Sequence, residues 1–349
     1  MTSTLTALAA VQLKRQAALP AKMADNPFRS AALHAIQQRN ATLDAIFYNV
    51  GKIDAAEVDS LAFWLAREGA LLIVPPSGKE RLTVCLDKAE FLAKGGAGVA
   101  ALAVAGVGSS ALGSAAFARD IADALDEPVA AVVSGYGLSD VLTEALGGFF
   151  WFGALNGIRH SFEGLDRQTK KLTASEPSLE ELGTEFARLS KDTATLIDLL
   201  EDPAFTVPLL IGHSKGNLVI SEALYALEVK GTLARVAKAS RIVTVSAKVG
   251  MPQAFKGNVL DIIGQWDGFG ALNSRPDIPA DLIVPGAWHS TNPQFPLGMG
   301  IDMTRVMKQA MTMMSQGPLP VPPMPALLPA TAALDLPQQL VGTMAEGGE

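Results

Sequence analysis

The stretch VPLLIGHSKGNLVISEAL, Val207 to Leu224, joins an apolar run, a Gly-His-Ser-Lys-Gly pentapeptide and a segment of helical spacing. The run before the pentapeptide predicts a buried strand, and the segment after it predicts a helix. Gly212 and Gly216 bracket Ser214 at the junction. A sharp strand-to-helix turn of this kind exposes a serine Oγ at the end of a strand. We therefore predict Ser214 as a nucleophile; an ordinary glycine-bounded turn is the alternative.

A nucleophilic serine needs a base, and the base needs an acid that orients it. When the serine lies on such a turn, the chain order is Ser, then Asp or Glu, then His. Of the four histidines in the chain, only His289 follows Ser214, in the loop-like stretch VPGAWHSTNP. His213 adjoins the serine, and we expect it to pack beside the turn. We predict His289 as the base; a surface histidine without a role is the alternative.

The stretch NVLDIIGQWDGFG, Asn258 to Gly270, offers two acids. Asp261 falls inside the strand predicted there, so its side chain should point into the packing of the sheet. Asp267 follows that strand in a glycine-flanked turn, which suits an acid that orients a base. We predict Asp267 as the acid, with Asp277 and Asp281 as further candidates.

The oxyanion that develops during attack on a carbonyl needs two aimed N–H donors. One should be the main chain of Lys215, the residue after the nucleophile. The other should come from SGYG, Ser134 to Gly137, as the N–H of Tyr136 or of Gly137. Gly135 would let a substrate approach the backbone closely. An ordinary strand-to-helix turn is the alternative for SGYG.

Four consecutive aromatic residues follow this loop: Phe149, Phe150, Trp151 and Phe152. Four consecutive side chains cannot share one face of a helix, so some of them should face a cleft or solvent. The cluster predicts a substrate-binding wall or lid. A buried helix segment is the alternative. We expect the Lys215 side chain at the surface with its aliphatic stem packed.

Strands and helices alternate from Asp120 onward, which predicts an α/β fold with a mostly parallel central sheet covered by helices on both faces. A last helix, about Ile301 to Met314, carries methionines at helical spacing, which we expect to be core contacts. The expected strands are Pro128–Val133, Val207–Ile211, Arg241–Ala247 and Asn258–Gly264.

The first 119 residues predict an N-terminal extension of helices and a hairpin. Asp54–Arg67 predicts a helix, and Ala70–Val74 with Arg81–Cys85 predicts the hairpin. The uncharged segment Gly95–Ala118 is long enough to span a bilayer. Because it is mostly Ala and Gly, we predict a buried, tightly packed helix instead. The chain thus divides into residues 1–119, a catalytic domain of residues 120–316, and a proline-rich tail of residues 317–349.

The composition and charge of the chain argue against several kinds of partner and cofactor. The formal net charge is −7 and no basic stripe is present, which argues against nucleic acid. The single cysteine, Cys85, and scattered histidines predict neither a disulfide nor a metal site, and we expect no cofactor. Lys14 and Arg15 follow the first apolar run, so no signal peptide is predicted and we expect a cytoplasmic protein. Peripheral membrane contact stays open.

The pentapeptide and its flanks resemble a known family. GHSKGN resembles GHSLGG of the lipase class 3-like branch of the α/β-hydrolase superfamily, and the stretches 241–255 and 261–279 are similar to its next strand and acid-bearing turn. The resemblance covers about residues 120–314 and departs at Lys215, Asn217 and Ser134. It implies an α/β-hydrolase fold and hydrolysis of carboxylic esters, lipid or polyester included, through an acyl-enzyme.

Two alternatives to ester hydrolysis stay open. An acyltransferase would use the same three residues but pass the acyl group to an alcohol or an amine. A non-catalytic scaffold would bind a membrane or a partner through Gly95–Ala118 and the proline-rich tail.

Overall fold

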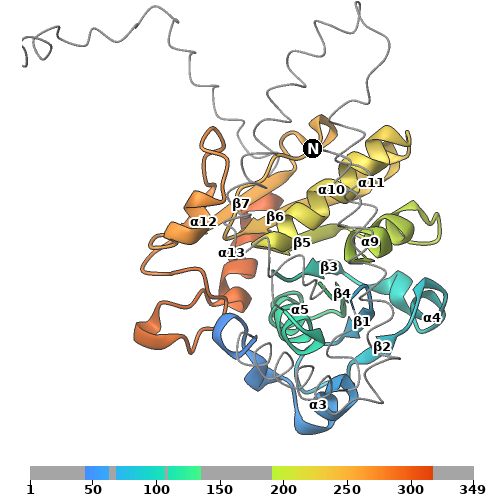
Figure 1. The fold of residues 1–349 in the computed structure, drawn as a ribbon, viewed down its shortest axis with the longest axis horizontal. Helices are drawn as coiled ribbons and strands as arrows, with labels where there is room; N and C mark the ends of the chain where they lie inside the picture. The colour runs from blue at the N-terminus through green and yellow to red at the C-terminus, as the bar shows by residue number, and fades with distance from the viewer. Residues whose placement is uncertain (1–43, 63–67, 107–108, 135–190, 317–349) are drawn as a thin grey trace, which may run out of the picture.

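The computed structural model describes residues 44–62, 68–106, 109–134 and 191–316 (Figure 1). Eight strands form one sheet in the order β2-β1-β4-β3-β5-β6-β7-β8. From β3 to β8 each strand is parallel to its neighbours within that group, whereas β1 is antiparallel to both β2 and β4. The strands are β1 Leu71–Val74, β2 Thr83–Cys85, β3 Ala101–Val104, β4 Val129–Val132, β5 Leu209–His213, β6 Arg241–Val245, β7 Val259–Gly264 and β8 Leu282–Val284.

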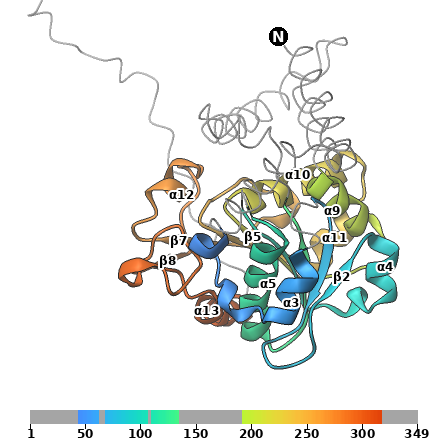
Figure 2. The same cartoon turned by 60° about the horizontal axis from the view of Figure 1, so that its bottom comes forward.

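Helices cover both faces of the sheet, so the fold is α/β with helix, sheet and helix layers (Figure 2). One face packs against α3, α5 and α13, and the other against α4, α9, α10 and α11. The helices are α3 Ala55–Ala62, α4 Lys88–Ala93, α5 Ala111–Leu125, α9 Lys191–Glu201, α10 Lys215–Val229, α11 Leu233–Ala239, α12 Gly268–Leu272 and α13 Met303–Ser315, with short 3₁₀ turns at Val50–Lys52, Gln253–Phe255, Gly96–Gly98 and Pro296–Gly298.

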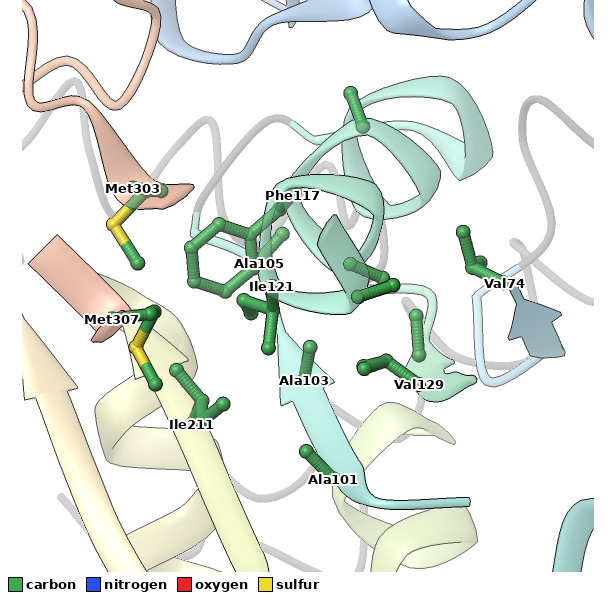
Figure 3. Close-up of a cluster of buried hydrophobic side chains, with 14 of the residues drawn as sticks. Val74, Ala101, Ala103, Ala105, Phe117, Ile121, Val129, Ile211, Met303 and Met307 are labelled. Atoms are coloured by element: carbon green, nitrogen blue, oxygen red, sulfur yellow. The ribbon is translucent and has the colours of Figure 1, made fainter. Parts of the chain in front are cut away.

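The alternation of side chains along each strand divides the core between the two faces. Figure 3 shows the α5 and α13 side, where Phe117 of α5 lies near Met303 and Met307 of α13, above the sheet residue Ile211. The predicted core role of the methionines holds for Met303, Met307 and Met314, which are buried, whereas Met311 is 38% exposed.

The prediction of one helix over Gly95–Ala118 is wrong. The segment forms a 3₁₀ turn, strand β3 and the first half of α5. All four residues of β3 are buried in the middle of the sheet, between β4 and β5. A short apolar run buried on both faces lacks a period that would separate a strand from a helix. The helix begins only after Ser110, whose Oγ accepts from the N–H of Leu112.

The boundary predicted between residues 119 and 120 falls inside α5. Strands β1 to β3 precede this position, yet they join the same sheet as the strands that follow it. The residues on the two sides of the boundary therefore build one sheet. The predicted hairpin is present as the antiparallel pair of β1 and β2, with Leu71 opposite Cys85.

The other expected elements of the described ranges lie close to their predicted positions. Strands β4 to β7 and helices α10 and α13 each start within two residues of expectation. Predictions on residues 1–43, 63–67, 135–190 and 317–349 lie outside the described residues. Among the helices that the structure describes, none is long and apolar enough to cross a membrane.

Candidate active site

Three predicted side chains meet at one edge of the sheet. The carboxyl ends of parallel strands lie at the same edge, which is where open α/β sheets bind their ligands. Ser214 directly follows β5, and Asp267 caps α12 just after β7. His289 lies in the loop between β8 and α13. The parallel strands thus bring together residues far apart in sequence.

The three side chains form a continuous hydrogen-bonded chain. The Nε2 atom of His289 lies 3.0 Å from Ser214 Oγ, and its Nδ1 atom lies 2.9 and 3.0 Å from the two carboxylate oxygens of Asp267. All three residues are buried, with exposed fractions of 6% for Ser214, 4% for His289 and 2% for Asp267. An imidazole held between a hydroxyl and a carboxylate is the arrangement that activates a serine.

The other three candidate acids have different partners. Asp261 lies within β7, where its carboxylate accepts from the hydroxyl of Thr244 on β6. The carboxylate of Asp281 accepts from the main-chain N–H of Asp261, and Asp277 pairs with Arg275. Of these acids, Asp267 is the one hydrogen-bonded to the His289 ring in the way that its position after the strand predicts.

The main chain of Ser214 is strained. Its φ of 52° and ψ of −119° lie outside the regions that non-glycine residues ordinarily adopt. The two flanking glycines make this turn sterically possible. A Cβ on Gly216 would lie 2.0 Å from the carbonyl oxygen of Val104, and one on Gly212 would lie 2.2 Å from Asn217 Oδ1. Gly216, at the start of α10, therefore packs directly against the end of β3, and Gly212 packs against the side chain of Asn217.

Asn217, where the sequence departs from the resembling family, ties the turn to the end of β6. Its Nδ2 atom donates to the carbonyl oxygens of Val245, at 3.0 Å, and Ala247, at 2.9 Å. The N–H of Ser214 also donates to Val245 O, at 2.9 Å. The end of β6 thereby fixes both the nucleophile and the first turn of α10.

The carboxylate of Asp267 contacts the main chain of α12 as well as the His289 ring. Its Oδ1 atom accepts from the N–H of Gly270 at 2.6 Å, which caps α12. A Cβ on Gly270 would lie 2.5 Å from Asp267 Oδ2 and 2.4 Å from the carbonyl oxygen of Ser246. The small residue at this position allows the acid to stay buried beside the loop that follows β6.

Aromatic side chains surround His289. Ring centroids of Phe269, Phe47 and Trp288 lie 5.0, 6.0 and 6.1 Å from the His289 ring. Phe269 is 42% exposed, and the neighbouring Trp266 is 61% exposed. Phe269 and Trp288 are neighbours of predicted site residues in the sequence and could have been marked on that ground. The predicted wall of Phe149, Phe150, Trp151 and Phe152 lies outside the described residues.

His213 packs beside the turn, as its position next to the serine predicts. Its side chain is buried, with Nδ1 2.9 Å from Tyr48 Oη and Nε2 3.0 Å from the carbonyl oxygen of His289. Burial, with a smaller contribution from the neighbouring His289, lowers the pKa of His213 to about 3. The imidazole is therefore neutral at physiological pH. No sequence signal marks Tyr48, because it is remote from every other site residue in the chain.

One side of the predicted oxyanion site is described. Lys215 is the first residue of α10, so its main-chain N–H belongs to the helix terminus next to Ser214. In the sheet, β3 lies between β4 and β5, so the strand that adjoins the nucleophile strand on this side is β3. The chain after β3 leads to Gly106. A Cβ on Gly106 would lie 3.1 Å from Ser214 Cβ. The candidates Tyr136 and Gly135, which follow β4, lie outside the described residues.

A charged cavity of about 450 Å³ has a lining that does not include Ser214, His289 or Asp267. Its lining includes Lys52, Asp120, Asp302 and Arg305, and Lys52 pairs with Asp120 at 2.8 Å. Within the part of the chain that the structure describes, no group of His, Cys, Asp and Glu side chains is arranged to hold a metal ion.

Comparisons with known proteins add little to this geometry. No family model matches the chain, and no curated protein matches it. Among solved structures the chain is similar to a hyperthermophilic esterase from the archaeon Pyrobaculum calidifontis, with 10% identity and a TM-score of 0.34, over 81% of this chain and 97% of that chain. A similarity at this level does not establish a function.

Proposed function

We propose that the protein is a serine hydrolase of carboxylic esters, built on an α/β-hydrolase fold. The observation that supports this best is the contact of His289 with Ser214 through one ring nitrogen and with Asp267 through the other. The strained turn at Ser214 and the chain order of serine, acid and histidine give further support.

Ser214, His289 and Asp267, called the trio below, each have a definite part in the proposed reaction. Ser214 Oγ attacks the carbonyl carbon of the ester while His289 Nε2 takes the hydroxyl proton. Asp267 holds the Nδ1–H tautomer and stabilises the imidazolium that forms. The tetrahedral intermediate then collapses, and His289 returns the proton to the departing alcohol. Water, deprotonated by His289, hydrolyses the acyl-enzyme and regenerates Ser214.

The oxyanion needs donors on the side of the carbonyl opposite to His289. We assign one donor to the N–H of Lys215 at the start of α10. The close approach of Gly106 to Ser214 favours the loop after β3 as the source of the second, because this loop neighbours the nucleophile strand. The N–H of Tyr136 stays a predicted alternative for the second donor. Gly135 stays predicted to let the substrate approach the backbone.

The surroundings of His289 favour an ester with an apolar group. Phe269 contacts the His289 ring edge-on and is partly exposed, and Trp266 beside Asp267 is more exposed still. Exposed aromatic side chains next to reactive groups offer binding surface for an acyl chain or an apolar alcohol. Lipid and polyester substrates fit this description.

The proposal is tested with a fluorophosphonate probe, which labels activated serines, and with p-nitrophenyl butyrate as substrate. Labelling and turnover are expected in the full chain and absent in Ser214→Ala. Ser221→Ala is the matched control, because this buried serine lies within α10, the helix that Ser214 precedes, and its hydroxyl donates to Gly250 O. Equal labelling of the chain and Ser214→Ala, or none of either, would refute the proposal.

A further inference from the structure

A second hydrogen-bonded chain runs behind the nucleophile. The N–H of Gly106 donates to Tyr48 Oη at 2.7 Å. Tyr48 Oη lies 2.9 Å from Nδ1 of His213, and Nε2 of His213 lies 3.0 Å from the carbonyl oxygen of His289. All these residues are buried, and Tyr48 and His213 are 2% and 1% exposed. The chain therefore joins the loop after β3 to the main chain of the proposed base.

The direction of every hydrogen bond in this chain follows from its chemistry. A carbonyl oxygen only accepts, so Nε2 of His213 must carry the proton. The neutral ring then accepts at Nδ1, and its low pKa of about 3 keeps it neutral. Tyr48 must donate its hydroxyl proton to Nδ1 while it accepts from Gly106. Both ring nitrogens of His213 and the Tyr48 hydroxyl have partners in this order, so the tautomer is fixed by the surroundings.

Both ends of the hydrogen-bonded chain lie close to Ser214. At one end, Gly106 is so close to the nucleophile that a Cβ on it would lie 3.1 Å from Ser214 Cβ. At the other end, the residue whose carbonyl is held supplies the ring that lies 3.0 Å from Ser214 Oγ. His213 itself directly precedes the nucleophile in the chain. The His213 side chain therefore links the residue before the nucleophile to the main chain of His289 directly, and to Gly106 through Tyr48.

The stretch that carries Tyr48 also holds the base loop through its main chain. The carbonyl oxygen of Phe47 accepts from the N–H and hydroxyl of Thr291, at 2.9 and 2.8 Å. The carbonyl oxygen of Ile46 accepts from the hydroxyl of Ser290 at 2.7 Å. The residues directly after His289 are thus anchored to the same segment that positions His213.

We propose that Tyr48 and His213 are positioning residues, which set the distance between His289 and Ser214 and fix the loop at Gly106. This role rests on the proposed function, since it concerns the same trio. Neither side chain contacts a reacting atom. Both act through the main chain of His289 and of Gly106, where a displacement of about 1 Å can lower a rate about 100-fold.

The first experiment removes one hydroxyl. Tyr48→Phe keeps the ring that packs edge-on against Phe117 and His213 but loses the donor to Nδ1. We expect kcat for p-nitrophenyl butyrate and the rate of fluorophosphonate labelling to fall about 10- to 100-fold, with KM changed less than about twofold. Tyr225→Phe is the matched control, a buried tyrosine near the far end of α10.

The second experiment asks whether the donor to His289 O is what matters. His213→Leu removes it, whereas His213→Gln keeps an amide N–H that can reach the same oxygen. We expect the labelling rate of His213→Gln to be at least about tenfold higher than that of His213→Leu. Thermal unfolding of both variants separates a local rate effect from a loss of folded protein.

The third measurement does not depend on activity. With ¹⁵N-labelled imidazoles, the His213 ring is expected to stay in the neutral Nε2–H tautomer from pH 5 to 9. A His213 ring that titrates in this range would overturn the proposal, as would wild-type labelling rates in folded Tyr48→Phe and His213→Leu. A wild-type chain that the probe does not label would instead refute the proposed function, while the imidazole spectrum still reports on the hydrogen-bonded chain.

Discussion

The side chain of Asn217 lies against Gly212 on the strand that ends at the nucleophile. A Cβ on Gly212 would come within 2.2 Å of Asn217 Oδ1 and 2.8 Å of its main-chain nitrogen. On its other side the same amide donates to two carbonyl oxygens after β6, those of Val245 and Ala247. The missing side chain at Gly212 therefore leaves the space that the Asn217 amide occupies, and that amide holds the turn in place. Substitution of either residue should disturb the turn.

Gly212→Ala should therefore be destabilising. The added methyl group has to displace an amide that is held by two hydrogen bonds, and overpacking of this kind costs about 1–3 kcal/mol. Chemical denaturation measures the loss, and slower fluorophosphonate labelling is expected to accompany it. Gly98→Ala is the control, since a Cβ there has nothing within 4 Å. Equal unfolding free energies for the two variants would contradict the packing argument.

Asp267→Asn tests the acid assigned to His289. The amide keeps the size of the carboxylate but cannot stabilise an imidazolium, and its NH₂ group favours the wrong tautomer of the ring. For the triad of a serine protease such a change lowers kcat about 10⁴-fold, and we expect a fall of about 10³- to 10⁴-fold here. The measurement is the rate of ester turnover, with thermal unfolding as the check on folding.

Asp261→Asn is the matched control for this prediction, because Asp261 lies within β7, shortly before Asp267 in the chain, and its carboxylate contacts Thr244. We expect its turnover to stay within about threefold of wild type, since no reacting group is touched. The assignment of Asp267 fails if the two variants lose comparable activity.

Asp261 also gives a prediction for stability against pH. Its side chain is buried in the sheet, and burial raises its pKa from 3.8 to about 7. Between these two values the folded state keeps a proton that the unfolded state has lost, so its contribution to stability falls as pH rises through about 7. The free energy of unfolding of Asp261→Asn, measured relative to wild type, should therefore increase from pH 5 to pH 8. A difference that is constant over this range would contradict the raised pKa.

The sequence predicted the trio because its members obey local and ordered rules. Ser214 is marked by flanking glycines between a strand and a helix, and chain order leaves His289 as the one histidine downstream. Asp267 is separated from Asp261 by its place after rather than within a strand. These signals need no knowledge of distant contacts, and the structure brings the same three side chains together.

What the sequence did not predict depends on contacts between distant segments. Strand β3 has the sequence ALAV and lies in a stretch rich in alanine and glycine, so the composition did not mark it as a strand. It is a strand because it pairs with β4 and β5 in the sheet. Tyr48 meets His213 from a separation of 165 residues. Neither periodicity nor a short motif reports a pairing of that kind, so the second hydrogen-bonded chain was not foreseen.

A buried ion pair joins α3 to α5. Arg119 Nη2 lies 2.6 Å from Glu57 Oε1, and both side chains are almost fully buried. The same carboxylate accepts from the N–H of Leu82 at the start of the strand β2 region. Arg119→Met leaves the Glu57 charge buried without its cation, and breaking a buried pair from one side costs about 3–5 kcal/mol.

The exposed pair of Lys79 and Asp126 provides the comparison for Arg119→Met. These two side chains lie 2.8 Å apart but are 52% and 82% exposed, so water already solvates both charges. Lys79→Met should cost less than about 1 kcal/mol. Urea denaturation at pH 7 compares the two variants with wild type, and Glu57→Gln combined with Arg119→Met should recover part of the loss because no charge then stays buried. An Arg119→Met variant as stable as Lys79→Met would show that the buried pair does not hold α3 in place.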